Sequence, residues 1–81
     1  MRVELTGALR VAAGNEASVE IEAETIKELL DRAIQRYPAM QAQMDGGGIA
    51  VSINGQIYRD DWRTPIPADA EVVLLPRIPG G

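Results

Sequence analysis

The chain has 81 residues and a formal net charge of −4, from 12 acidic and 8 basic side chains. It contains neither cysteine nor histidine, which excludes disulfide scaffolds, thiolate or imidazole metal sites, catalytic triads and thiol nucleophiles. No apolar run approaches the roughly 18 residues of a membrane span, and the acidic balance is atypical of nucleic-acid binding. Because the first residues also lack a secretory apolar region, we expect one small cytoplasmic domain without membrane or nucleic-acid partners.

The chain opens with two segments in which apolar and polar residues alternate. The first covers residues 2–9, where every second residue is apolar or glycine, and the second covers residues 18–23. A period of two predicts half-buried strands. Turn residues lie between them at 12–15. We therefore expect a hairpin whose connection is longer than a tight two-residue turn.

A helix is predicted after these strands. Thr25 and Glu28 form a capping-box pattern, in which the Thr25 hydroxyl caps the helix and Glu28 reaches back to the N–H of Thr25. Apolar residues at i, i+3, i+4, i+7, i+8 and i+11 follow over residues 26–37. Pro38 disfavours helical geometry at the residue before it, so the helix is expected to end there. Residues 39–44 are expected to add a further helical turn.

The second half of the chain predicts three more strands. The glycines at 46–48 are interpreted as a connector, because a phosphate-binding loop requires a Gly-Lys-Ser/Thr sequence that is absent. Residues 49–54 form a strand pattern, and Asn54 with Gly55 predicts a tight turn into a short strand at 56–59. The continuous apolar run within residues 71–75 predicts a central strand that is covered on both faces.

This order of elements predicts an α+β fold. One amphipathic helix suffices to cover one face of a mixed four- or five-stranded sheet, as in the β-grasp fold of ubiquitin. We assign residues 1–75 to this β-grasp domain. Residues 76–81 are expected to form an extended, flexible tail that ends in Gly-Gly.

The tail offers one reactive group, the α-carboxylate of Gly81. Pro76 cannot donate a hydrogen bond to a sheet, so the last strand should end near it. Gly80 and Gly81 lack a Cβ atom and can enter a narrow channel. Attack of the carboxylate on the α-phosphate of ATP would give an activated acyl group, which could pass to sulfur or to an amine. The alternative is an inert, frayed terminus.

The sequence resembles the ubiquitin-like sulfur carriers, which include the molybdopterin-synthase small subunit and the thiamine-pathway carrier. The resemblance covers essentially the whole chain and rests on the helix end at Tyr37, the turn at Asn54 and Gly55, and the tail at 74–81. The tail departs from the family pattern at Pro79, where a small Ala, Ser or Thr is common. The chain length and the Leu-Leu-Pro run resemble the molybdopterin branch, which we favour slightly, whereas Asn-Gly-Gln-Ile resembles the thiamine branch.

Membership implies a carrier that acts with partners and is not an enzyme by itself. A ubiquitin-activating-type adenylyltransferase would use Mg-ATP to adenylate Gly81, and a persulfide donor would then produce a thiocarboxylate. The sulfur would pass on at a synthase large subunit or a thiazole synthase, and this chain would bind no cofactor or metal itself. Gly80 would be the slender spacer. The residues implied as partner contacts are Pro76, Arg77, Ile78, Pro79 and Gly80.

Two other function classes remain open. A protein modifier would join Gly81 to lysines of target proteins, although Lys27 is the one lysine of this chain and offers little for building chains on itself. A bare interaction domain would have an inert tail.

The loop before the last strand carries further candidates. Acidic residues, namely Asp60, Asp61, Asp69 and Glu71, are interpreted as a solvated loop, with a cation site as the alternative. Trp62 is interpreted as a cap over the core, with a partner anchor as the alternative. Arg59 and Arg63 flank it and are interpreted as solvated, with contacts to a partner's carboxylates or to ATP phosphates as the alternative.

Overall fold

The computed structural model describes residues 1–46 and 48–77 of the chain. The elements in this part of the chain are β1 (Arg2–Leu5), α1 (Gly7–Ala12), β2 (Ser18–Glu20), α2 (Ile26–Arg36), α3 (Met40–Gly46), β3 (Ile49–Ile53), β4 (Gln56–Tyr58) and β5 (Val72–Pro76). None of the helices within it combines the length and the apolar character that a bilayer crossing requires.

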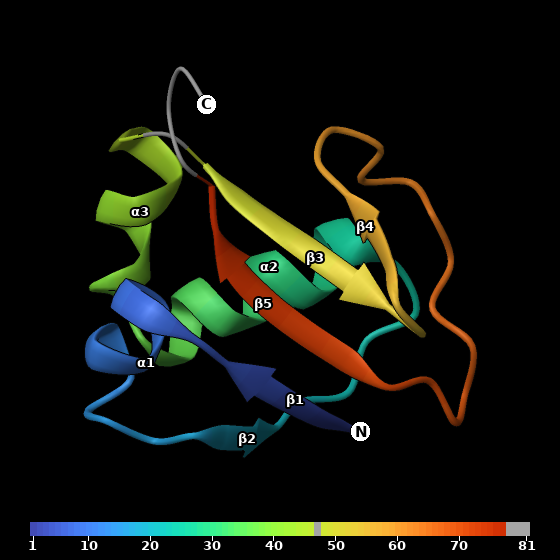
Figure 1. Ribbon diagram of the computed structural model, residues 1–81, viewed down its shortest axis with the longest axis horizontal. Helices are drawn as coiled ribbons and strands as arrows, with labels where there is room; N and C mark the ends of the chain where they lie inside the picture. The colour runs from blue at the N-terminus through green and yellow to red at the C-terminus, as the bar shows by residue number, and fades with distance from the viewer. Residues whose placement is uncertain (47, 78–81) are drawn as a thin grey trace.

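The strands of the described residues form one mixed sheet in the order β2-β1-β5-β3-β4. The central strand β5 pairs parallel with β1 and antiparallel with β3, and the two outer pairs are antiparallel. In Figure 1, α2 crosses behind the sheet, and α3 lies beside the ends of β3 and β5. The arrangement confirms the predicted α+β β-grasp fold and the central position of the last strand.

The predicted first strand is wrong beyond Leu5. Gly7 has a φ of +55°, outside the extended region, and begins the short helix α1. The carbonyl of Thr6 accepts hydrogen bonds from the N–H groups of Leu9 and Arg10. Leu9 is fully buried as the alternating pattern required, but it reaches the core from a helix. Over so short a segment, an apolar residue at every second position does not distinguish a strand from a helical turn.

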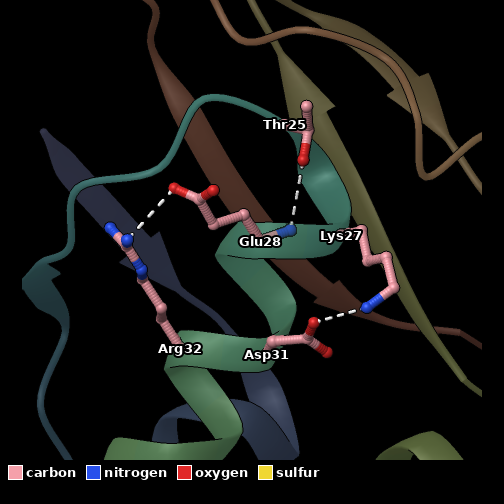
Figure 2. A pocket seen from close by; sticks show the side chains of 5 residues that line it. All are labelled: Thr25, Lys27, Glu28, Asp31 and Arg32. Atoms are coloured by element: carbon pink, nitrogen blue, oxygen red, sulfur yellow. Dashed lines mark hydrogen bonds and ion pairs between the residues drawn. The ribbon is translucent and has the colours of Figure 1, made fainter.

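The helix α2 begins and ends as predicted, with one change in its cap. Thr25 Oγ1 accepts a hydrogen bond from the N–H of Glu28 at 3.3 Å, as Figure 2 shows. The Glu28 carboxylate accepts from the N–H of Glu24 at 3.3 Å, one residue before the predicted partner. The helix ends at Arg36 with Tyr37 as its C-cap. Its buried side chains are Ile26, Leu29, Leu30 and Ala33.

The core lies between α2 and one face of the sheet. In the central strand, Val72 and Leu74 are buried against this core, whereas Val73 and Leu75 are half-buried on the opposite face. The prediction that the last strand is covered on both faces is therefore wrong. A continuous apolar run signals a central position, but it does not establish that a second layer covers the outer side chains.

The hairpin of β3 and β4 confirms the predicted turn. Asn54 and Gly55 have φ angles of +51° and +87°, the combination that a two-residue type I′ turn requires. Asn54 also binds the start of the last strand, because its Oδ1 accepts from the N–H of Glu71 at 2.9 Å. The short strand ends at Tyr58, one residue earlier than predicted.

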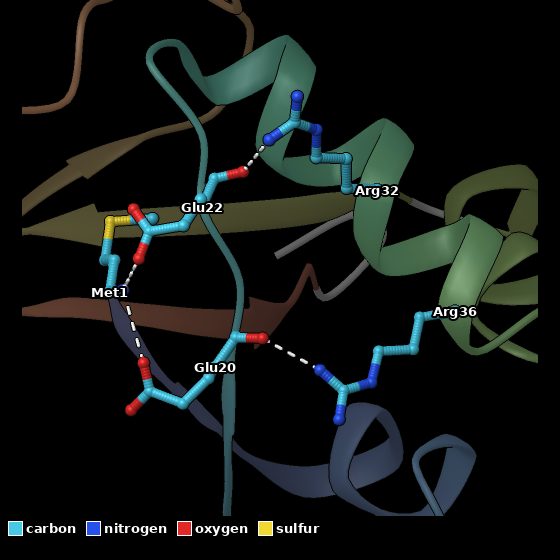
Figure 3. A network of polar contacts seen from close by, with 5 residues as sticks. All are labelled: Met1, Glu20, Glu22, Arg32 and Arg36. Atoms are coloured by element: carbon cyan, nitrogen blue, oxygen red, sulfur yellow. Dashed lines mark hydrogen bonds and ion pairs between the residues drawn. The ribbon is translucent and has the colours of Figure 1, made fainter.

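The edge strand β2 is shorter than predicted and is tied to α2, as Figure 3 shows. Arg36 donates to the backbone carbonyl of Glu20 at 2.8 Å, and Arg32 donates to that of Glu22. The amine of Met1 forms ion pairs with the Glu22 and Glu20 carboxylates, the latter at 3.2 Å. The hydrogen bond to Glu22, followed by the one to Glu20, raises the pKa of the Met1 amine above its ordinary value. Arginines thus satisfy edge carbonyls that could otherwise pair with another chain.

Candidate functional site

The candidate site is the tail root, by which we mean Pro76 and Arg77, the last two described residues. The central strand β5 brings them to one end of the sheet, where Pro76 lies opposite Ile49 of β3. The N–H of Arg77 then donates to the carbonyl of Gly48 at 3.1 Å. The structure therefore keeps Pro76 within β5, one residue beyond the predicted boundary at Leu75. The tail leaves from the middle of the sheet.

The start of α1 packs against the tail root. A Cβ atom added to Gly7 would lie 3.1 Å from Cγ of Pro76, which is a tight contact. Nearby, Thr6 Oγ1 donates to the carbonyl of Leu74 at 3.1 Å and so binds the same strand. The sequence analysis missed Gly7 as a contact of the tail. A glycine inside an alternating pattern is a signal of close backbone approach that could have identified it.

Arg77 is also held through its side chain. Its Nη1 atom lies 3.1 Å from Oδ1 of Asp60, in the loop after β4, and the two side chains are 40% and 82% exposed. A Cβ atom added to Gly48 would lie 3.6 Å from Cδ of Arg77, so the arginine stem passes close over this glycine. The structure thus joins a predicted tail residue to an acidic residue that the sequence analysis had left in a solvated loop.

The opposite face of the sheet carries an open-face strip of apolar side chains next to the tail root. We define this strip as Ile57, Val73 and Leu75, with the buried Ala50 and the half-buried Ser52 of β3 between them. Residues paired directly across neighbouring strands share a face, and the register pairs Ala50 with Leu75 and sets Ser52 opposite both Val73 and Ile57. Ile57 is 52% exposed. Because Leu75 lies two residues before Arg77, the strip is continuous with the tail root.

The residues of the loop after β4 differ in how far they are buried. Trp62 is half-buried and packs against the core, which confirms the core-cap interpretation, and its carbonyl accepts from the N–H of Lys27 at 2.9 Å. Arg59 and Arg63 are exposed. Within residues 1–46 and 48–77, no group of three or more acidic side chains is placed to hold a metal ion. The cation-site alternative for the acidic loop thus has no support there.

A charged depression lies over the first two turns of α2, as Figure 2 shows. Its charges are paired with one another: Lys27 Nζ lies 2.7 Å from the Asp31 carboxylate, and Arg32 lies 3.3 Å from that of Glu28. Both pairs follow the i,i+4 spacing that stabilises exposed helices. We assign this depression to helix stabilisation. It contains no residue of the tail root.

Four of the predicted site residues, namely Ile78, Pro79, Gly80 and Gly81, lie outside the described part of the chain. The structure brings together Pro76 and Arg77 of the predicted set and adds three neighbours that sequence reasoning did not connect to them. These neighbours are Gly7, Gly48 and Asp60. The described part of the site holds the tail root in place and contains an exposed ion pair.

Comparison with solved structures finds the same fold in proteins of matching length. The solution structure of the small archaeal modifier protein 1 (SAMP1) from Methanosarcina acetivorans has a TM-score of 0.79 and 26% identity, and the alignment covers 99% of this chain and 94% of that one. In the Amycolatopsis orientalis BexX/CysO complex, the matching chain has a TM-score of 0.76 and 23% identity. The alignment covers 99% of this chain and 98% of that one. A putative molybdopterin converting factor subunit 1 from Pyrococcus furiosus has a TM-score of 0.71 and 15% identity, with 95% of each chain covered. The last two likenesses concern the fold alone.

Comparison with curated proteins found no match. The sequence model of the ThiS family, in contrast, matches residues 3–81. This match covers all of the sheet and helices except the first strand residue, and it extends through the tail. It confirms the resemblance to ubiquitin-like sulfur carriers, and the chain therefore belongs to the ThiS family.

Proposed function

We propose that this chain is a sulfur carrier whose terminal glycine, Gly81, is adenylated by a partner enzyme and converted to a thiocarboxylate. The thiocarboxylate then donates its sulfur in cofactor biosynthesis. The observation that carries the proposal is the tail root, because the central strand ends at Pro76 and leads into a segment that begins at Arg77 and ends in Gly80 and Gly81. Membership of the ThiS family supports the same role.

The proposed chemistry needs no general acid or base from this chain. A carboxylate oxygen of Gly81 attacks the α-phosphorus of ATP, and pyrophosphate leaves. The terminal sulfur of a partner's persulfide attacks the acyl carbon, and AMP leaves. A thiol then attacks the partner's sulfur in the resulting acyl disulfide, so that the S–S bond breaks, the thiocarboxylate leaves and a disulfide forms between that thiol and the partner. The slender glycines would let the partner close around the acyl group and exclude the water that would hydrolyse it.

We further propose that the adenylyltransferase docks on the open-face strip. This apolar surface leads through Leu75 to Arg77, so one partner can cover the strip and receive the tail at the same time. The net charge of −4 favours an electropositive partner surface, which would raise the association rate more than the affinity. The Leu-Leu-Pro run before the tail leads us to favour the molybdopterin synthase large subunit slightly over thiazole synthase as the recipient.

A second candidate is a protein modifier that forms isopeptide bonds through Gly81. It is favoured by the likeness to SAMP1 from Methanosarcina acetivorans, which is called a small archaeal modifier protein. The same activated carboxyl group would serve both roles, since an acyl adenylate can pass to a thiol or to an amine. The two candidates differ in the bond that Gly81 finally forms.

The test is thiol alkylation of the chain purified from its own host, followed by intact-mass analysis and mapping of the label. The chain has no cysteine, so a thiocarboxylate is the group expected to react. We expect one alkyl group at Gly81. A chain extended by one residue is the matched control, and it should keep its fold but take up no label.

Two results would contradict the carrier proposal. The first is the absence of label when the adenylyltransferase and the sulfur donor are shown to be active, and the second is equal labelling of the extended chain. Adducts between Gly81 and lysines of other proteins would support the modifier instead. Deletion of Gly80 and Gly81 without loss of function would contradict both.

A further inference from the structure

We propose that Asp60 is a positioning residue for the tail. Through its ion pair with Arg77, it holds the point at which the chain leaves the sheet and so favours the conformations in which Gly81 enters a partner's active site. The inference rests on the proposed function, because it names a residue that prepares the tail for that reaction. Asp60 itself would touch neither the substrate nor the reacting atoms.

The first support is that Arg77 is held at two separate points. Its backbone N–H binds the carbonyl of Gly48 at 3.1 Å, and its guanidinium group lies 3.1 Å from the Asp60 carboxylate. Gly48 directly precedes β3, whereas Asp60 follows β4. The backbone contact thus extends the pairing of β5 with β3 by one residue, and the side-chain contact reaches past β3 to the loop after β4. A residue that is held by both its backbone and its side chain has a restricted orientation.

The second support is the selectivity of the contact. Asp61 is the next residue and is also exposed, yet among the described residues it takes part in no ion pair. Arg59 and Arg63 are the basic residues of the same loop, and they too form no ion pair within that part of the chain. The structure thus joins one acid of the loop to the one arginine of the tail, and Asp61 provides a matched control.

The third support is the size of the effect that such a contact can have. An exposed ion pair changes an equilibrium constant by a factor of about two to five. This factor is too small to determine whether the domain folds. The same factor is sufficient to change how readily a partner engages the chain at Arg77. We therefore expect Asp60 to affect the apparent affinity for the tail and to leave the stability of the domain nearly unchanged.

The experiment begins with trypsin, which requires no partner. Cleavage after Arg77 removes residues 78–81 and requires the arginine side chain to enter the protease. A guanidinium group held by Asp60 must first be released, so Asp60→Asn should raise the initial rate of tail loss by about two- to fivefold. Asp61→Asn should cleave at the wild-type rate, and Asp60→Glu should restore most of the protection. The intact mass of the product distinguishes cleavage after Arg77 from cleavage at the other basic residues. Equal melting temperatures of the variants and the wild type show that the variants are folded.

Salt provides a second readout. Raising the ionic strength screens an exposed pair, so the difference between Asp60→Asn and Asp61→Asn should shrink in high salt. With the adenylyltransferase, Asp60→Asn should raise the KM for the carrier by a similar factor and leave kcat unchanged, because the bound tail reacts as before.

Equal tryptic rates for Asp60→Asn and Asp61→Asn would overturn the proposal, as would an unchanged or lowered KM. Faster tail loss in Asp60→Asn together with no adenylation of the wild-type chain would support the tail-holding contact and contradict the proposed function. The two failures are therefore distinguishable.

Discussion

Replacement of Gly7 by alanine tests whether α1 supports the tail root. The φ of +55° at Gly7 costs an L-residue about 1–2 kcal/mol. The added Cβ would lie 3.1 Å from Cγ of the half-buried Pro76, and crowding against a side chain that can shift adds about 1 kcal/mol. Alanine also lowers the conformational entropy of the unfolded chain, which stabilises the folded state by about 0.4–1 kcal/mol. We therefore expect Gly7→Ala to lower the free energy of unfolding by about 2 kcal/mol.

Gly14→Ala is the matched control. Gly14 has a similar φ of +71°, but a Cβ atom there would meet nothing within 4 Å. Gly14→Ala should therefore lower the free energy of unfolding by about 1 kcal/mol. The cost of the positive φ and the lower entropy of the unfolded chain both apply there, but the crowding does not. The difference of about 1 kcal/mol between the two variants reports the contact with Pro76.

The assay is equilibrium unfolding in urea, followed by the fluorescence of Trp62, which packs against the core in the folded state. A double-mutant cycle with Pro76→Ala isolates the contact. In the Pro76→Ala background, Gly7→Ala should cost about 1 kcal/mol less than in the wild type. Equal losses for Gly7→Ala and Gly14→Ala, or strict additivity with Pro76→Ala, would refute this reasoning.

Two further predictions concern α2 and the N-terminus. Thr25→Ala should lower the free energy of unfolding by about 1 kcal/mol because the N–H of Glu28 loses its cap, whereas Thr25→Ser should stay close to the wild type; equal urea midpoints for the two variants would contradict the capping role. The pKa of the Met1 amine is raised above its usual value of 8.0, chiefly by the hydrogen bond to Glu22, so its contribution to stability is complete below about pH 8 and is lost as the pH rises through the raised pKa. The difference in urea midpoint between wild type and Glu22→Gln should therefore be largest near neutral pH and decline in alkaline solution, and a difference that does not change with pH would count against this ion pair.

Features that depend on neighbouring residues could be predicted from the sequence. The cap and apolar stripe of α2 involve residues three or four positions apart, and the turn at Asn54 and Gly55 depends on two residues that tolerate positive φ. The chemistry proposed for Gly81 likewise follows from the last residues of the chain. These elements were predicted because the cap and stripe of α2 lie within one short segment and the turn of the hairpin requires only two adjacent residues.

The tertiary structure decided how distant segments meet at the tail root. The sequence shows a glycine at 7, an acidic pair at 60 and 61, and an arginine at 77, but nothing local indicates that Gly7 faces Pro76 or that Asp60 rather than Asp61 holds Arg77. It also decided that β1 ends at Leu5 and that the central strand is covered on one face. These outcomes depend on the order of the strands in the sheet, because the parallel pairing of β1 with β5 places the end of β1, which leads into Gly7, beside the end of β5. Contacts between residues so far apart form only once the sheet has assembled, and no local sequence pattern encodes them.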